Sequence, residues 1–336
     1  MSEQNKGRLG WLDIGKGIAM LFIMMSHTVW VPDIYCHFFK PIYLSFFFCA
    51  SGYVFSLGKD FSSFAKNKVR TLLLPWFTLS MISIFSSQVI STGNHTLKAD
   101  LIGTLLQIRG QNDYMWFIAC LFLAEFIFYF IVKYVNTRYR ICVYLFGLAY
   151  SIVLYRCGVS PLPWHIQTMG VSIFFLGLGY EFKIHENQIK PYINTKMLTV
   201  SSIAYFAFML LKRYILGDKY IIKINEYDSN ALVWTVGSLL ALWLFLQVIQ
   251  KIEHDKVLEF IGRNTLVYFA FQFKFQRIFE IIVNKIKMVN WPFSTWYISA
   301  ISVIFEACCL AVVAVIFNRY LYFLLGKSTS SKSRKY

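Results

Sequence analysis

Long runs of apolar residues, separated by short polar segments, dominate the pattern of this chain. Ten runs come close to the length of roughly 20 residues that a helix needs to cross the hydrocarbon core of a bilayer. They lie near residues 12–31, 41–57, 71–90, 114–132, 141–155, 166–182, 197–211, 231–249, 265–283 and 297–317. The pattern predicts an all-α fold, a polytopic membrane bundle of about ten transmembrane helices.

Composition supports a single membrane bundle rather than soluble domains. The chain has 336 residues, of which 57% are hydrophobic and only 15% are charged, whereas about a quarter of the residues of a soluble domain are charged. The first run follows Lys6 and Arg8 as a signal peptide would, but it contains charges and lacks a small-residue cleavage site, so we expect an uncleaved first helix. We assign residues 1–320 to the transmembrane domain and 321–336 to a basic cytoplasmic tail.

The basic residues predict the orientation of the bundle. With the N-terminus inside, the cytoplasmic segments are 1–11, 58–70, 133–140, 183–196, 251–263 and 318–336. These hold roughly twice as many Lys and Arg residues as the opposite loops, which is the asymmetry of positive-inside topology. Both termini are therefore expected in the cytoplasm. The orientation of the protein in the lipid bilayer then explains the net charge of +16, and no nucleic-acid partner is expected.

The first run carries three ionisable residues, Asp13, Lys16 and His27. Eleven residues of helix make about three turns, so Lys16 and His27 share one face and lie about 16 Å apart along the axis. Asp13 precedes Lys16 by three residues and can pair with it. Two interpretations stay open: a cytoplasmic anchor with an interfacial histidine, or a polar site within the bundle, where charges are costly unless used or paired.

Two further runs carry polar candidates. Lys68 and Arg70 precede the third run, where they either orient the helix or bind phosphate. Trp116 begins the fourth run and suits an interfacial aromatic belt. Glu125 lies near the middle of the same run, so its carboxylate should face a partner or a polar cavity.

The remaining polar residues give weaker signals. Glu306 resembles Glu125 in its setting, and Arg277 is one turn from Glu280 and can pair with it. The seven cysteines are scattered without a CxxC pair, so we predict neither a metal site nor a disulfide framework. Five histidines fall in predicted loops or at the ends of runs, where solvated or interfacial roles are expected: His37, His95, His165, His185 and His254.

Six segments, in this order, resemble the acyltransferase 3 family: LDIGKGIAMLFIMMSH, FFFCASGYVFS, FAKNKVRTLLLPWF, MWFIACLFLAE, FFLGLGYEF and IGRNTLVYFAFQF. Members of that family are membrane acyltransferases of about ten helices that O-acylate carbohydrates. The family's first-helix signature is a basic residue followed, after ten intervening residues, by a histidine, and it falls on Lys16 and His27. The family more often has Arg where Lys16 stands, and many members have a histidine near the position of Gln272.

The resemblance implies transfer of an acyl group, most simply acetyl, from cytoplasmic acyl-CoA to a hydroxyl of an envelope glycan or its lipid-linked precursor in a bacterial plasma membrane. His27 would act as the general base, because a neutral imidazole can accept the hydroxyl proton. Lys16 would lie toward the donor, oriented by Asp13. The expected co-substrate is acyl-CoA, with no metal and no other cofactor.

The same resemblance suggests roles for the other candidates. Lys68 and Arg70 would hold the CoA phosphates at the cytoplasmic mouth, and Trp116 and Glu125 would lie on the acceptor side. A different class of function remains as the alternative: a glycan or lipid transporter, whose buried charges would line a translocation path. A polysaccharide polymerase is a further enzymatic alternative.

Overall fold

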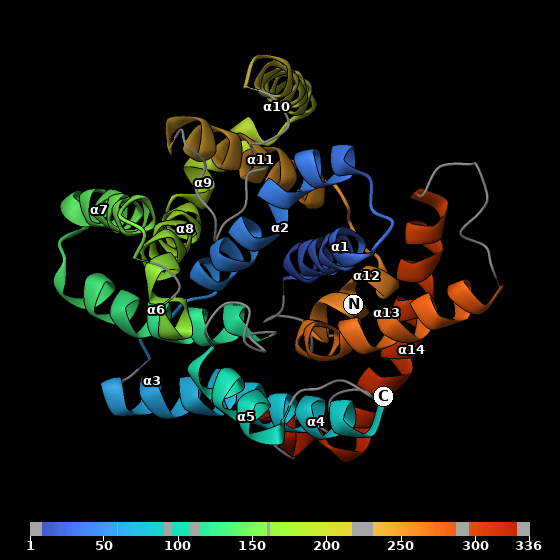
Figure 1. The fold of residues 1–336 in the computed structure, drawn as a ribbon. Helices are drawn as coiled ribbons and strands as arrows, with labels where there is room; N and C mark the ends of the chain where they lie inside the picture. Colours follow the sequence, from blue (N-terminus) through green and yellow to red (C-terminus); the bar gives the residue numbers. More distant parts are fainter. Residues whose placement is uncertain are drawn as a thin grey trace, which may run out of the picture.

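The computed structural model describes residues 9–58, 60–90, 96–107, 115–159, 162–216, 231–286 and 296–327. All regular structure in these residues is helical, which confirms the predicted all-α class (Figure 1). The α-helices are α1 (Gly10–His27), α2 (Asp33–Tyr53), α3 (Phe61–Lys68), α4 (Leu74–Ile90), α5 (Leu97–Leu106), α6 (Trp116–Tyr134), α7 (Thr137–Arg156), α8 (Ile166–Ile184), α9 (Glu186–Ile189), α10 (Thr195–Leu216), α11 (Ala231–Gln250), α12 (Lys256–Arg263), α13 (Thr265–Ile286) and α14 (Trp296–Tyr320).

Five helical segments of the described chain are long and apolar enough to cross a membrane. They are Phe61–Ser86, Trp116–Tyr134, Thr195–Ile215, Val233–Gln250 and Trp296–Tyr320. The helices α1, α2, α7, α8 and α13 have 18 to 22 residues each, but polar, charged or glycine residues dilute their apolar character. The fold is therefore that of a helical membrane protein, and the number of ten spans stays a prediction.

Two helices differ from the predicted boundaries in an informative way. Helix α2 begins at Asp33 rather than near residue 41, and Pro41 lies inside it. Helix α2 continues through the proline, although Pro41 has no N–H and so removes one backbone hydrogen bond from the helix. The third span extends back to residue 61, because a π-helical turn, η2 (Val69–Leu73), joins α3 to α4.

Contacts between residues far apart in the sequence bring several helix ends together. The Arg263 Nε lies 3.3 Å from the Asp13 carboxylate, joining the end of α12 to the beginning of α1. The Lys183 ammonium donates to the Phe55 carbonyl at 3.2 Å, joining the end of α8 to the chain just after α2. The predicted cytoplasmic segments thus meet at one end of the bundle, which we call the basic end. Residues 1–8 and 328–336 of those segments lie outside the described residues.

The first residues of the predicted tail pack against the bundle. A short helical turn, η6 (Tyr322–Leu325), follows α14. The Thr78 hydroxyl donates to the Leu324 carbonyl at 2.9 Å, and Leu325 is buried. The Lys327 ammonium donates to the Asn318 side chain at 2.6 Å. The chain therefore stays attached to α4 and α14 as far as residue 327.

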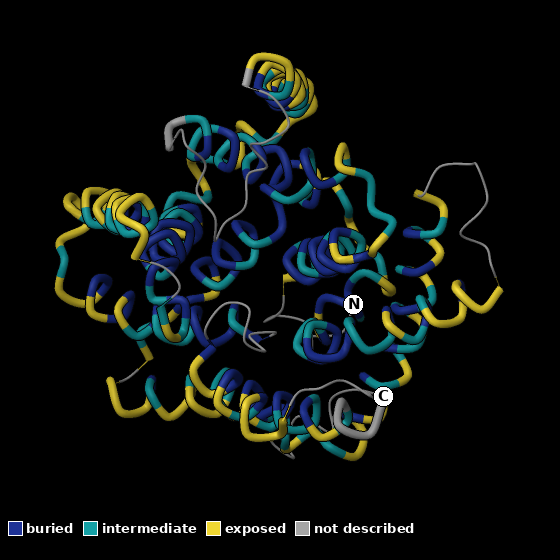
Figure 2. Tube along the Cα trace, in the orientation of Figure 1, coloured by how far each residue is buried: buried dark blue, intermediate teal, exposed yellow. Residues whose placement is uncertain are grey.

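Helix α1 occupies the middle of the bundle. It contacts α2, α11, α12, α13 and α14, and Figure 1 shows it surrounded by these helices. Three of its residues, Ala19, Met20 and Met24, are completely buried. Figure 2 shows the contrast with α7 and α10, whose outward faces are exposed at the periphery. Residues on α1 are therefore held by several neighbouring helices at once.

Two glycines bring α1 and α12 into backbone contact. A Cβ on Gly17 would lie 2.2 Å from the Leu258 carbonyl oxygen, and a Cβ on Gly262 would lie 1.8 Å from the Asp13 carbonyl oxygen. Neither distance is sterically possible, so only glycine permits this approach. The Asp255 side chain caps α12 by accepting from the Leu258 N–H at 2.8 Å. The backbone contact at Gly17 and Gly262 fixes the position of α12 against the first helix.

We expect Gly262→Ala to destabilise the protein, because the new methyl group would meet the backbone of α1. Overpacking of this kind costs about 1–3 kcal/mol, although alanine has the higher helix propensity. Gly10→Ala is the matched control, since its Cβ would lie 3.7 Å from the nearest atom, on the Glu259 side chain. Thermal unfolding of the detergent-solubilised variants measures the difference. Equal unfolding temperatures for both variants would contradict the close contact.

Candidate functional site

One face of α1 carries a sequence of chemically different side chains. At about 100° per residue, Lys16, Met20, Ile23 and His27 fall within about 60° of one another around the helix. Lys16 lies near the basic end, and His27 is the last residue of α1, at the opposite end. The structure confirms that Lys16 and His27 lie on one continuous helix, for which their spacing predicts a shared face.

His27 presents an accessible imidazole at the end of the central helix. The residue is classed as exposed although it follows buried Ser26. Its ring packs edge-on against Phe273 of α13, with 4.9 Å between ring centroids, and its backbone carbonyl accepts a hydrogen bond from the Gln276 side chain. Among the described residues no hydrogen bond is made by either ring nitrogen, so the backbone is anchored while the imidazole can meet a substrate.

Asp13 and Lys16 belong to a larger charged cluster at the basic end. The Lys16 ammonium lies 4.0 Å from one Asp13 oxygen, and Arg263 Nε lies 3.3 Å from the other. Arg263 also pairs with Glu259 one turn earlier on α12, and Glu259 in turn contacts His254. The two carboxylates are almost fully buried, whereas the basic side chains are partly exposed. The predicted proximity of Asp13 to Lys16 is present, but Asp13 lies closer to Arg263.

Sequence reasoning missed Arg263 and Glu259. Both lie in a segment predicted as a cytoplasmic loop, where their charges indicated only orientation. The segment forms α12 instead, and α12 places Arg263 beside Asp13. A signal was present, since Gly262 and Arg263 begin the last of the six family-like segments.

Lys68 and Glu125 form a buried ion pair. Their Nζ and Oε2 atoms are 2.8 Å apart, and their side chains are 16% and 3% exposed. The Lys68 ammonium also lies 5.8 Å and 5.6 Å from the ring centroids of Phe55 and Phe64. The family resemblance suggests the donor side for Lys68 and the acceptor side for Glu125, but the structure brings the two side chains together. Glu125 neutralises the lysine within an aromatic surrounding.

Arg70 and Trp116 lie apart from this pair. Arg70 is exposed in η2, and its carbonyl oxygen lies against Gly326 after α14. Trp116 begins α6, nine residues and about 13 Å before Glu125 along the axis, so it belongs to the end opposite the basic end. The centroids of the Trp116 and His165 rings are 4.6 Å apart. The four predicted binding residues thus lie in three places: Lys68 with Glu125, Arg70 beside Gly326, and Trp116 beside His165.

Two of the histidines expected in solvated or interfacial positions are buried. His165 is completely buried beside α6, and His37 is 1% exposed with its Nε2 2.9 Å from the Met209 carbonyl oxygen. The expectation was wrong for His37 because α2 begins before Pro41 and takes the histidine into the bundle. His95 lies outside the described residues.

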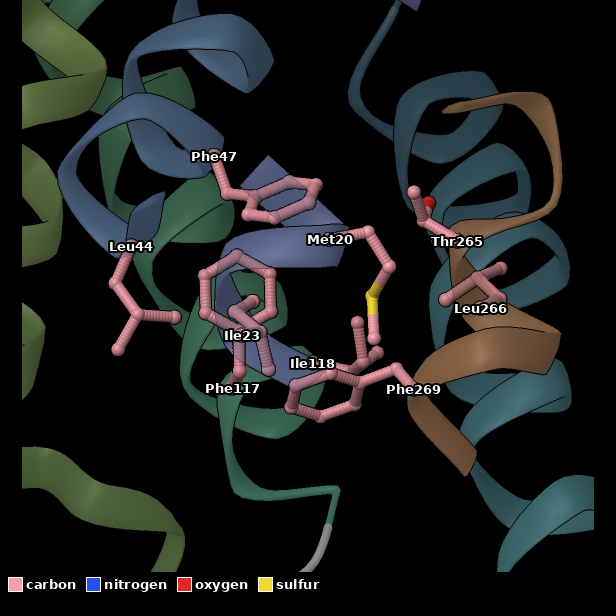
Figure 3. A pocket seen from close by; sticks show the side chains of 9 residues that line it. All are labelled: Met20, Ile23, Leu44, Phe47, Phe117, Ile118, Thr265, Leu266 and Phe269. Atoms are coloured by element: carbon pink, nitrogen blue, oxygen red, sulfur yellow. The ribbon is translucent and has the colours of Figure 1, made fainter. Parts of the chain in front are cut away.

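An apolar pocket lies along α1 between Lys16 and His27. Met20 and Ile23 form its wall on α1, and side chains from α2, α6 and α13 point toward them (Figure 3). The volume of the cavity is about 40 Å³. The lining from the other three helices is Leu44, Phe47, Phe117, Ile118, Thr265, Leu266 and Phe269.

Beside the pocket, α13 carries a buried polar side chain with no partner. Gln272 is 1% exposed, and neither its amide nitrogen nor its amide oxygen makes a hydrogen bond in the described part of the chain. On a helix, Phe269, Gln272 and Gln276 fall on one face. Since Phe269 lines the pocket and Gln276 contacts His27, Gln272 lies between these two points along α13. A buried amide without partners is costly and calls for an explanation.

Other charges predicted inside the spans have internal partners. Arg277 pairs with Glu280 at 3.0 Å, as their spacing predicts. Glu306 is buried and accepts a hydrogen bond from the Ser302 hydroxyl at 2.7 Å. No cluster of three or more His, Cys, Asp or Glu residues within the described ranges could hold a metal ion.

We expect a double-mutant cycle to show that Lys68 and Glu125 support each other. Removing one partner by Lys68→Met or Glu125→Leu leaves a buried charge and costs about 3–5 kcal/mol. The double variant replaces both charges with apolar groups, and we expect it to be more stable than either single variant. Thermal unfolding in detergent measures all four proteins. A Lys68→Met variant with the unfolding temperature of the native protein would show instead that Lys68 is available to bind a substrate.

Comparison with known proteins gives one match. The model of a family described as "Acyltransferase domain", the acyltransferase 3 family, matches residues 9–322. No curated protein and no solved structure matches the chain. The match includes α1 with Lys16 and His27, the ion pair of Lys68 with Glu125, and the pocket. Because the match covers nearly the whole chain, this protein belongs to the acyltransferase 3 family of membrane acyltransferases.

Proposed function

We propose that this protein transfers a short acyl group, most simply acetyl, from cytoplasmic acyl-CoA to a hydroxyl of an envelope glycan or its lipid-linked precursor. The observation that carries the proposal is the single face of α1, with a basic cluster at one end and an accessible imidazole at the other. Family membership supports the acyl transfer, and the resemblance described above suggests the donor, the glycan acceptor and the bacterial plasma membrane.

The donor enters from the basic end in this proposal. Lys16 and Arg263 are partly exposed there, and both can donate hydrogen bonds to phosphate oxygens. Buried Asp13 and Glu259 hold the two side chains in place. Lys68 is a less suitable phosphate ligand, because Glu125 already engages its ammonium. The positive-inside charge distribution supports assigning this end to the cytoplasm.

The reaction takes place at His27 at the opposite end. Its imidazole accepts the proton of the acceptor hydroxyl as the oxygen attacks the carbonyl carbon of the thioester. A carbon–oxygen bond forms, the carbon–sulfur bond breaks, and the imidazolium returns its proton to the leaving thiolate. Phe273 and Gln276 hold His27 during this exchange. Trp116 lies at the same end and is the candidate for contact with the acceptor sugar.

We expect His27→Ala to abolish esterification of the acceptor glycan, because the general base is lost. General-base catalysis contributes about 100-fold or more. The measurement is mass spectrometry of envelope glycans from cells expressing either protein, with membrane levels compared in parallel. His185→Ala is the control, since His185 is partly exposed at the basic end and pairs with Glu181. We expect that variant to retain the ester.

The same experiment can reject the proposal. Glycans that lack the ester even with the native protein, or carry it equally with His27→Ala, would remove the catalytic role of His27. A transport function would then become the leading hypothesis.

We expect Lys16→Gln to weaken binding of coenzyme A by about tenfold, because it removes a charge-assisted hydrogen bond to phosphate. Lys16→Arg should retain binding, since a guanidinium also donates to phosphate. Lys190→Gln is the control for loss of a positive charge at the same end, and Lys190 is exposed and paired with Glu186. Titration calorimetry with the purified protein gives the three dissociation constants. Equal weakening by Lys16→Gln and Lys190→Gln would indicate only a general charge effect.

A further inference from the structure

We propose that the apolar pocket on α1 holds the acyl group of the donor and restricts it to short chains, with the Gln272 amide donating to the acyl carbonyl oxygen. This inference rests on the proposed acyl transfer and goes beyond it, because it names the residues that select the chain length. The pocket, the position of the buried amide and the spacing along α1 carry it.

The pocket lies between the two ends of the proposed reaction path. At a rise of about 1.5 Å per residue, Met20 is about 6 Å and Ile23 about 10 Å from Lys16 toward His27. Both residues line the pocket. A donor whose phosphates bind near Lys16 and whose thioester reaches toward His27 therefore passes this wall. Ile23 precedes His27 by one helical turn, about 6 Å, so the acyl group of a thioester held at His27 reaches this wall by lying back along the face of α1.

The lining matches an alkyl group rather than a phosphate or a sugar. Of the nine lining residues only Thr265 is polar, and none is charged. Figure 3 shows the aromatic rings of Phe47, Phe117 and Phe269 turned toward Met20 and Ile23. These rigid rings bound the empty space on the side away from α1. Each extra methylene of a longer chain would have to displace one of them from a packed core, which is costly.

Gln272 supplies the polar group that an acyl carbonyl requires. Its amide is buried and has no partner in the described residues, and it follows Phe269 by one turn on the same face of α13. His27 contacts Phe273 and Gln276 on the next turn. A carbonyl placed beside Gln272 would accept a hydrogen bond from the amide, which stabilises the negative charge that develops on the oxygen during attack.

The experiment compares acyl donors in competition. Membranes from cells expressing the protein receive an equimolar mixture of acetyl-, propionyl- and butyryl-CoA, and mass spectrometry gives the ratio of the three esters on the extracted glycans. We expect acetyl to dominate with the native protein. Met20→Ala enlarges the pocket and should raise the propionyl-to-acetyl ratio about tenfold, the effect of one methylene in an apolar pocket.

Matched variants distinguish a change in pocket size from an effect of any substitution on α1. Met25→Ala makes the same change on the opposite face of α1, and we expect the native ester ratio. Leu44→Ala enlarges the pocket from α2, so it repeats the test if Met20→Ala does not reach the membrane. Because the readout is a ratio, it does not depend on the amount of protein.

Gln272→Leu tests the amide. Replacing a buried polar group without partners by an apolar one is neutral or stabilising, so we expect an unchanged or higher unfolding temperature. Acyl transfer at saturating acetyl-CoA should nevertheless fall about tenfold. A variant that transfers at the native rate would overturn the role of Gln272.

The outcomes distinguish the two levels of the proposal. No ester of any length with the native protein would remove the proposed function itself. Efficient transfer by the native protein, with the same ester ratio in Met20→Ala and Leu44→Ala as in Met25→Ala, would overturn the pocket while leaving acyl transfer intact.

Discussion

The close contact between α1 and α12 is the constraint on which the site depends. Gly17 and Gly262 allow the two backbones to touch, and this approach brings Arg263 to the Asp13 carboxylate. Helix α1 also carries Lys16, the pocket wall and the His27 imidazole, so this one helix sets the spacing between them. Packing between small residues is the main source of helix association in a membrane, where burial of apolar surface gives little driving force.

A second constraint is the cost of charge within an apolar bundle. Lys68 and Glu125 offset this unfavourable free energy by pairing with each other. Asp13 and Glu259 offset it by pairing with Arg263. Such pairs hold helices in register, and the ammonium of Lys68 is too deeply buried to be readily available to a ligand, whereas Lys16 and Arg263 remain partly exposed. The exposed imidazole of His27 contrasts with them, because its ring nitrogens have no hydrogen-bond partner in the described residues. This difference separates charges that support the fold from a group that can act on a substrate.

Much of this arrangement could be predicted from the sequence, because long apolar runs and helical geometry are local properties. The shared face of Lys16 and His27 follows from their spacing alone. The partnership of Lys68 with Glu125 could not be predicted, since it depends on how the segment before α4 packs on α6. Short α12 resembles a charged loop in its composition, so Arg263 was missed. Pro41 suggested a helix start, and His37 was therefore placed outside the bundle.

The chemistry along α1 suits the separate parts of an acyl donor and its reaction. Anionic phosphates suit the cluster of Lys16 and Arg263, an alkyl chain suits the wall of Met20 and Ile23, and proton transfer suits His27. Each of these features alone has a structural explanation. A straight helix presents them on one face over about 16 Å, and neighbouring α13 carries the buried Gln272 amide one turn before Gln276, which contacts His27. It is this combination on two neighbouring helices that favours a reaction path over a set of unrelated packing contacts.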